Sequence, residues 1–139
     1  MNYSTFNINN FFIKKNSTFP LFKYPLIQQI REKYDITDDM LENVAVTFSM
    51  MDADTGLYKI ANAPANLVII NDIAANPDEE KYTLTYKFKL KDTNRSGRYL
   101  AEITVDFLGS QYGCGKIKFP IEGYVNVVIS DSITKTTVI

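Results

Sequence analysis

The sequence predicts an all-β fold, a single antiparallel β-sandwich of about seven or eight strands. Segments in which apolar and polar residues alternate recur along the chain, and such alternation is typical of half-buried strands. Residues that favour turns separate these segments at intervals of roughly ten residues. The pattern contains no long helix, no heptads and no internal repeat. A small barrel is the second possibility, because the same strands can close on themselves.

The composition is that of one globular domain. The chain has 139 residues, of which 45% are hydrophobic, so a core can form. The 15 Lys and Arg residues nearly balance the 16 Asp and Glu residues, which argues against sequence-independent nucleic-acid binding. No apolar run approaches the roughly 18 residues that span a bilayer, and the start lacks the pattern of a secretory signal. We therefore expect neither nucleic acid nor membrane as a partner.

The chain contains no histidine and a single cysteine, Cys114. Nucleophiles activated by histidine and metal sites built on histidine are therefore excluded. One cysteine cannot form an internal disulfide or, within one chain, a zinc or iron–sulfur site, which agrees with a reducing place of synthesis. We expect a protein that is not an enzyme and carries no cofactor.

The predicted sandwich domain covers residues 11–130. Residues 1–10 are polar and rich in asparagine, so we expect a flexible N-terminal arm, and residues 131–139 are expected to form a C-terminal tail. A first short strand is predicted at 11–13. Residues 19–27 suit an edge strand, because each of their two prolines lacks a backbone N–H.

The middle of the chain predicts a polar connection followed by a hairpin. Residues 28–42 are polar and are expected to run over the surface, with one helical turn near Thr37. Residues 43–51 alternate as a strand, and the turn after them leads into a second strand at 57–60. Pro64 marks a predicted break, after which residues 66–70 form a β-branched strand.

The stretch from Lys81 to Leu108 holds the strongest strand signals. Two alternating runs flank a connector of turn-forming residues, so the sequence predicts a hairpin whose strands pair antiparallel. A second sheet is then needed to cover their common apolar face. Only Leu100 breaks the polar set of the second run. The apolar positions are Tyr82, Leu84, Tyr86, Phe88 and Leu90, and then Tyr99, Ala101, Ile103, Val105 and Phe107.

The last part of the chain predicts two more strands. Three glycines between residues 109 and 115 indicate a turn, and residues 116–119 form a strand after it. Pro120 and Gly123 mark a bend before the final strand at 124–129.

Two groups of carboxylates invite a functional interpretation, and both favour a structural one. Residues 92–97 resemble the start of a calcium-binding EF-hand loop, but position twelve is Ile103 where that loop needs a bidentate glutamate. We interpret them as a turn. Glu102 and Asp106 share the solvent face of one strand, where no cleft encloses them as glycoside hydrolysis requires.

Aromatic residues crowd the N-terminal edge segment. They are candidates for protein interaction, because an exposed apolar edge can act as a docking strand or as an anchor for a neighbouring subunit. Packing within the chain explains the same residues equally well. The candidates are Phe11, Phe12, Phe19, Phe22 and Tyr24.

Several motifs together resemble one known family. An Asp-Thr sequence begins at Asp92, Gly-x-Tyr-x-Ala-Glu spans residues 97–102, and Phe-Pro at residue 119 precedes Gly123-Tyr124. The order of these motifs resembles the N-terminal domain of phage baseplate upper proteins, and the resemblance covers most of residues 11–130. The resemblance implies an immunoglobulin-like β-sandwich.

The resemblance also implies a function. The family consists of non-enzymatic virion components that dock onto a phage tail or baseplate. The chain ends about ten residues after the domain, without a receptor-binding module, so we expect an adaptor subunit of the tail, baseplate or neck. It would bind other virion structural proteins, form homo-oligomers in the particle and be assembled in the cytoplasm of the bacterial host. A capsid decoration or head-fibre-base protein is the first alternative, and a carbohydrate-binding module is the second.

Overall fold

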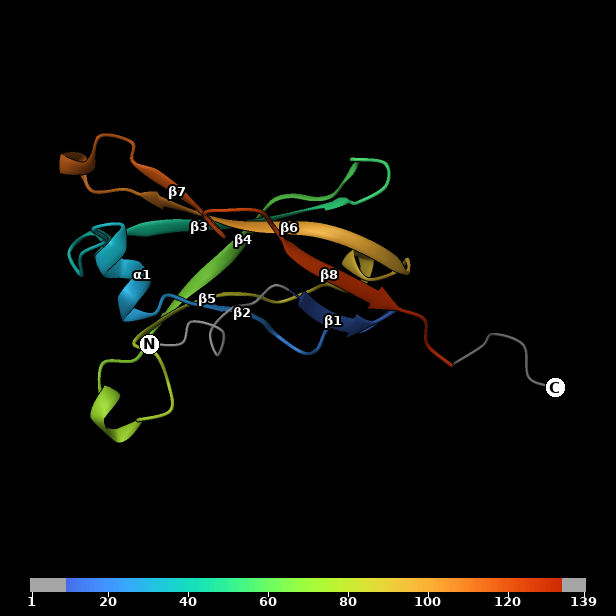
Figure 1. Cartoon of the computed structure of the whole chain (residues 1–139), viewed down its shortest axis with the longest axis horizontal. Coiled ribbons are helices and arrows are strands. Elements are labelled where there is room, and N and C mark those ends of the chain that lie inside the picture. The colour runs from blue at the N-terminus through green and yellow to red at the C-terminus, as the bar shows by residue number, and fades with distance from the viewer. Residues whose placement is uncertain (1–9, 134–139) are drawn as a thin grey trace.

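A computed structural model describes residues 10–133 and confirms the all-β prediction (Figure 1). Apart from Asn10 and residues 131–133, the expected arm and tail lie outside the described residues. The strands are β1 (Asn10–Lys14), β2 (Phe22–Pro25), β3 (Val44–Asp52), β4 (Tyr58–Ile69), β5 (Tyr82–Tyr86), β6 (Gly97–Phe107), β7 (Lys116–Phe119) and β8 (Val125–Ser130). The helices are α1 (Gln28–Lys33) and the short 3₁₀ segments η2 (Met40–Glu42), η3 (Ile73–Ala75), η4 (Leu90–Asp92) and η5 (Ser110–Tyr112).

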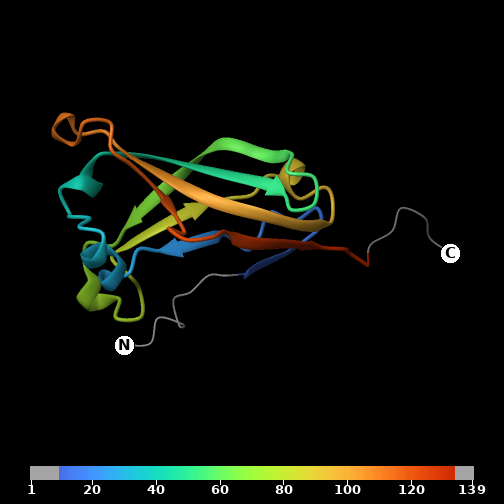
Figure 2. The same ribbon diagram turned by 45° about the horizontal axis from the view of Figure 1, so that its top comes forward.

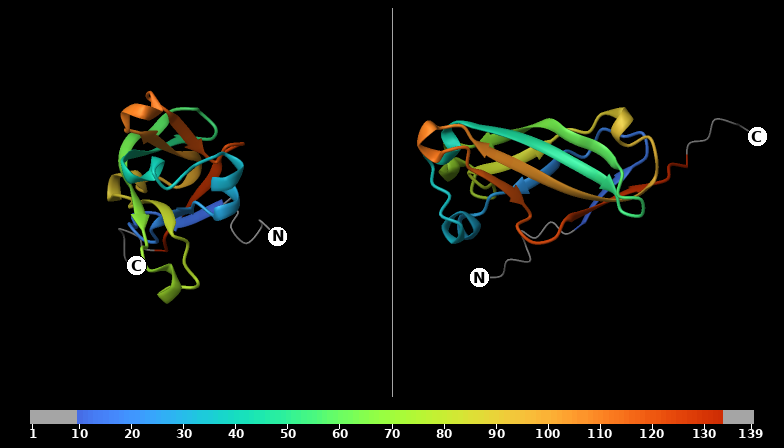
Figure 3. Two further views of the ribbon diagram at one scale, coloured as in Figure 1. Left: turned by 90° about the vertical axis from the view of Figure 1, so that its left-hand side faces the viewer. Right: turned by 90° about the horizontal axis from the view of Figure 1, so that it is seen from above.

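The strands form one continuous, strongly curved sheet in the order β1-β8-β6-β3-β4-β5-β2. Strand β6 pairs with β8 along its first part and with β7 along its second part. Strand β4 pairs with β3 and then, from Asn66 onward, with β5. Figures 2 and 3 show that the ribbon wraps around a common interior. The arrangement therefore approaches the barrel that the sequence left as the second possibility.

Strands β1 and β8 pair in parallel, from Asn10 opposite Asn126 to Lys14 opposite Ser130. All other pairs are antiparallel, so the prediction of a purely antiparallel sheet is wrong at this edge. Alternation along a strand predicts which face is buried but carries no information about strand direction. No tight turn joins β1 to β8 to impose an antiparallel pair.

The hairpin predicted between residues 81 and 108 does not form. Strand β5 pairs with β4 and β2, whereas β6 pairs with β3, β7 and β8. The two runs bury the predicted faces except at Leu90, which begins η4 and is 60% exposed, so the prediction is wrong at that residue. The two runs lie across the core from each other. The Tyr86 ring of β5 stacks on the Phe48 ring of β3, next to β6, with centroids 4.4 Å apart.

Aromatic rings hold the two ends of the sheet together. Strands β1 and β2 are last in the strand order and share no backbone ladder. The Phe11 ring of β1 lies 5.3 Å from the Phe22 ring of β2 and 5.6 Å from Phe88. Phe22 in turn lies 5.0 Å from Phe48. Side-chain packing therefore closes the fold where hydrogen bonds do not.

The predicted break at Pro64 is wrong, because β4 continues from Tyr58 to Ile69 without interruption. Pro64 lies opposite Thr47 of β3, and β5 joins the other side of β4 only from Asn66. No described strand pairs with the second side of β4 at Pro64, and proline is tolerated on such an unpaired edge. A bulge precedes it at Asn62, whose φ is 52° and whose N–H donates to Ser49 Oγ at 2.9 Å.

The hairpin between β3 and β4 confirms its prediction. The Asp52 carboxylate accepts the N–H groups of Asp54 at 2.8 Å and Thr55 at 3.0 Å, which shapes the turn. These hydrogen bonds hold the pKa of Asp52 below its usual value. In the connection at 28–42 the sequence predicted one helical turn near Thr37, which η2 approximates, but it did not predict α1.

The crossover between β5 and β6 is fixed by a buried carboxylate. Asp92 Oδ2 accepts the Tyr86 hydroxyl at 2.7 Å and the Lys89 N–H at 2.9 Å. Next to it, Thr93 Oγ1 donates to the Ser17 carbonyl at 2.8 Å. Asp92, the first residue of the 92–97 stretch that resembles an EF-hand loop, is 3% exposed and is therefore part of the buried core.

Substituting Asp92→Ala is expected to lower the free energy of unfolding by about 3 kcal/mol, because a buried hydroxyl and a buried N–H lose their shared acceptor. Urea unfolding measures this loss. Lys91→Ala, at the exposed neighbouring position, is the matched control and is expected to change the value by less than about 0.5 kcal/mol. Equal effects of the two substitutions would contradict the anchoring role.

Stability is expected to fall at alkaline pH because of Tyr82. Burial, followed by its hydrogen bond to Asp38 Oδ1 at 2.8 Å, raises the pKa of Tyr82 from 10.0 to about 12. The folded state thus binds this proton more tightly than the unfolded state does. Its contribution is complete below pH 10.0 and is lost as the pH rises toward about 12. Chemical denaturation across this range should give a shallower decline for Tyr82→Phe than for the wild type; identical slopes would refute the assignment.

Candidate functional site

The five aromatic residues singled out by the sequence occupy different environments. Phe12 is 65% exposed and Phe19 is 72% exposed, whereas Phe11 and Tyr24 are half-buried. Phe22 is fully buried and packs on Phe11 and Phe48. The structure therefore assigns Phe22 to the core and leaves Phe12 and Phe19 as surface residues.

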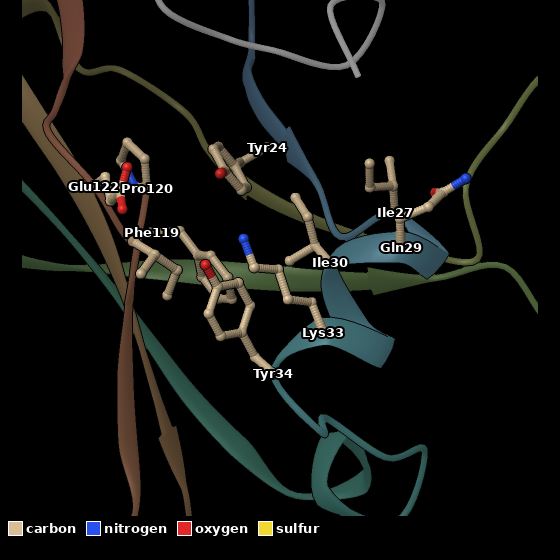
Figure 4. Close-up of a pocket in the computed structure, with 10 residues that line it drawn as sticks. Tyr24, Ile27, Gln29, Ile30, Lys33, Tyr34, Phe119, Pro120 and Glu122 are labelled. Carbon is tan, nitrogen blue, oxygen red and sulfur yellow. The ribbon is translucent and has the colours of Figure 1, made fainter. Parts of the chain in front are cut away.

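A groove lies where β2, α1 and the β7–β8 connection meet (Figure 4). Its volume is about 370 Å³. Among the described strands, β2 pairs only with β5 and β7 pairs only with β6. The Tyr24 and Phe119 rings bridge these strands with centroids 5.4 Å apart. The groove thus lies between two strands that are linked by side-chain contacts and not by a backbone ladder.

Helix α1 supplies one wall of this groove. Ile27, Ile30 and Tyr34 recur at helical spacing, which places them on one face toward the core and the groove. Arg31 Nε donates to the Leu26 carbonyl at 2.9 Å and ties the helix to the end of β2. The Gln28 amide donates to Glu32 Oε1 at 2.8 Å on the outer face. The helix is therefore held in one orientation against the sheet.

The groove combines an apolar lining with a few polar groups. Ile27 and Phe119 are buried, and Ile121 on the rim is 41% exposed. The polar lining residues are Tyr24, Gln29, Lys33, Tyr34 and Glu122. Figure 4 shows the Lys33 ammonium group reaching between the two tyrosines, with Glu122 on the opposite wall. Burial, and then the nearby Tyr34, raise the pKa of Tyr24.

A second surface lies on the outer face of the sheet. Tyr58 of β4, Met51 of β3 and Leu100 of β6 are cross-strand neighbours in one row. In this row β8 contributes Asn126, opposite Leu100; one row along, Val128 of β8 lies between Arg98 of β6 and Phe12 of β1. On the other side of the Leu100 row, Tyr124 directly precedes β8 and lines a hollow together with Leu100 and Glu102. We call Tyr58, Met51, Leu100, Val128, Phe12 and Tyr124 the outer-face patch; Tyr58 is 68% and Tyr124 49% exposed.

Four residues of the outer-face patch, all except Val128 and Phe12, line a hollow of about 200 Å³. Ser49 and Glu102 add polar groups to its lining, which also includes Met51, Tyr58 and Tyr124. Glu102 Oε1 lies 3.5 Å from Lys118 Nζ, so an ion pair borders the apolar residues. Two sequence signals pointed to this surface: Leu100, an apolar residue in an otherwise polar set, and Phe12, one of the predicted interaction residues.

The carboxylates considered in the sequence are not brought together with metal-binding partners. Within residues 10–133, no three or more Cys, Asp or Glu side chains gather in a way that would hold a metal ion. Glu102 pairs with Lys118 and Asp106 pairs with Lys116, at 3.5 Å each. Cys114 is an exposed free thiol in the loop before β7. No helix in this part of the chain is both long and apolar enough to cross a bilayer.

Comparison with protein-family models, curated proteins and solved structures gave no match.

The different environments of the aromatic residues give a direct test. Phe22→Ala is expected to lower the free energy of unfolding by about 3–5 kcal/mol, because it opens a cavity among packed rings. Phe12→Ser and Phe19→Ser are expected to change it by less than about 0.5 kcal/mol, because both side chains face solvent. Guanidinium unfolding of the three variants and the wild type measures these changes in the free energy of unfolding. A large loss for Phe12→Ser would mean that Phe12 is part of the core.

Proposed function

We propose that this protein is a bacteriophage virion structural protein, a non-enzymatic adaptor subunit of the tail, baseplate or neck that docks neighbouring virion proteins. The outer-face patch is the observation that carries the proposal. It runs diagonally across β4, β3, β6, β8 and β1, with Asn126 opposite Leu100 as a polar interruption, and it places several partly or well exposed apolar side chains on one face of the sheet. Extended exposed apolar surfaces of this kind mark interaction sites.

The chemistry of the outer-face patch suits an apolar surface of a neighbouring subunit. Its side chains project from paired strands, so little backbone order is lost on association. Burying apolar area stabilises a complex by roughly 25 cal/mol per Å². Polar groups border the patch, including Arg98 beside Val128 and the Glu102–Lys118 ion pair. An apolar centre with a polar rim is the usual anatomy of a protein interface.

The resemblance to baseplate upper proteins supplies the virion setting of the proposal. It also supports describing the fold as a modified immunoglobulin-like sandwich in which the two layers stay joined. In this description β2, β5 and the second part of β4 form one layer, and β3, β6 and β8 form the other. The crossover between β5 and β6 passes from one layer to the other, as sandwich connections do.

Glycan binding is the second candidate function. The hollow of the outer-face patch carries Tyr58 and Tyr124, whose ring faces can stack on sugar rings, and Glu102, whose carboxylate can accept sugar hydroxyls. We rank protein docking first because the apolar residues extend beyond the hollow to Val128 and Phe12.

Docking through the outer-face patch is tested with Leu100→Ser and the matched control Leu108→Ser. Both leucines are partly or well exposed, but Leu108 lies outside the patch. Tagged protein is supplied during infection, and mass spectrometry quantifies it in gradient-purified particles separated into tail and capsid fractions. The wild type and Leu108→Ser are expected in tails. Leu100→Ser should be depleted by about tenfold, since a buried leucine contributes roughly 1.5–3 kcal/mol.

Other distributions have definite meanings. Wild-type protein that follows capsids would move the subunit to a decoration or head-fibre-base role. Wild-type protein absent from both fractions would overturn the virion proposal. Equal incorporation of Leu100→Ser and Leu108→Ser would leave the virion role standing and reject the outer-face patch as its docking surface.

A further inference from the structure

We propose that the groove between β2, α1 and the β7–β8 connection binds the C-terminus of a partner peptide, an apolar last residue with its free carboxylate. The groove is separate from the outer-face patch, and the inference does not rest on the virion proposal. It follows from the shape of the groove, its charges and the arrangement of its hydroxyl groups.

The shape and lining of the groove suit an apolar side chain. Its volume of about 370 Å³ falls within the range of small-ligand sites, which are mainly apolar with a few placed polar groups. Buried Ile27 and Phe119 lie in the lining, and half-buried Ile30 adjoins them. Ile121, on the rim, is 41% exposed. An apolar side chain in the groove would cover Ile121 and replace water against these residues.

The charges of the groove define the polar ends of the occupant. Lys33 is the one cation and Glu122 the one anion among the lining residues that the structure describes. They lie on opposite walls (Figure 4), and neither forms an ion pair with a described residue. A complementary occupant therefore carries a negative group toward Lys33 and hydrogen-bond donors toward Glu122.

The two tyrosines complete a site for a carboxylate. Figure 4 places the hydroxyl groups of Tyr24 and Tyr34 on either side of the Lys33 ammonium group. Lys33 Nζ lies 5.4 Å from the centre of the Tyr34 ring, so the side chain is directed over the aromatic wall. One ammonium and two phenol groups can donate hydrogen bonds to the two oxygens of a carboxylate.

A peptide C-terminus matches all of these features. Its last side chain is attached directly beside its carboxylate, so both fit within one short groove. Its backbone N–H groups can donate to Glu122. Lys33 and Glu122 are both exposed, so the choice of occupant rests on complementarity: a neutral sugar offers no counter-charge to Lys33, and a fatty acid brings no donor to Glu122. Capture of a C-terminal carboxylate is an established mode of peptide recognition.

The test uses the full chain and a random heptapeptide library with free C-termini. Selected peptides are expected to end in an aliphatic or aromatic residue. Fluorescence polarisation then compares each selected peptide with its C-terminal amide, and amidation is expected to weaken binding at least about tenfold. Lys33→Met should weaken binding of the free acid by a similar factor and leave the amide unchanged. Glu122→Gln should weaken both forms by a smaller factor.

Matched controls keep the outcome decisive. Lys23→Met removes an exposed lysine of β2 that does not line the groove, and Tyr58→Ser alters the outer-face patch. Both should bind like the wild type, and amide NMR spectra confirm that every variant is folded. The inference is overturned if the library yields no binder, if acid and amide bind equally, or if Lys33→Met behaves like Lys23→Met. Decanoate binding that depends on Lys33 while no peptide binds would assign the groove to an amphiphile and likewise overturn it.

Discussion

The buried carboxylate of Asp92 is the constraint on which the arrangement of the sheet depends. It accepts hydrogen bonds from the Tyr86 hydroxyl and the Lys89 N–H where the chain leaves β5 and crosses the core toward β6. The crossover places β5 and β2 opposite β6 and β8 instead of beside them. The Tyr86 ring can then stack on Phe48, and the aromatic core forms between the two halves of the sheet. The hydrogen bonds of Asp92 thus link the end of β5 to the start of the crossover between the two halves of the sheet.

Both candidate surfaces follow from this arrangement. Strand β2 pairs with β5 on the far side of the core from β6, and its other side faces β7. The Tyr24 ring of β2 contacts the Phe119 ring of β7, and the two strands share no backbone ladder. The groove lies between them. Because β6 keeps β3 and β8 as neighbours, Leu100 lies opposite Met51 on one side and opposite Asn126 on the other, with Val128 one row along. An extended outer face and a short groove present different binding chemistry, one suited to an apolar protein surface and the other to a chain end.

The unpaired parts of the sheet differ in how well they resist association. The first half of β4 pairs only with β3, but Pro64 lacks an N–H there, and the bulge at Asn62 bends the strand. Such features discourage edge-to-edge pairing. Strand β2 carries Lys23 and Pro25. The outer-face patch has no comparable protection at its centre. Association through side chains on the face is therefore favoured over strand addition at an edge, which agrees with a subunit that docks on preformed surfaces.

The sequence by itself determined the β class, most strand positions and most of the buried side chains, because the period-two alternation is a local property of the chain; Leu90, which is exposed, and Thr85 and Thr104, which are buried, depart from it. Tyr99 and Ile103 are buried as the alternation predicts. It could not determine strand neighbours, so β5 and β6 were paired wrongly, and it did not predict α1. Of the sites, Tyr24 and Leu100 gave partial signals, but their partners Phe119 and Met51 are remote in sequence. Only the tertiary structure decided which residues meet, because pairing and packing over long separations depend on the whole core and not on local pattern.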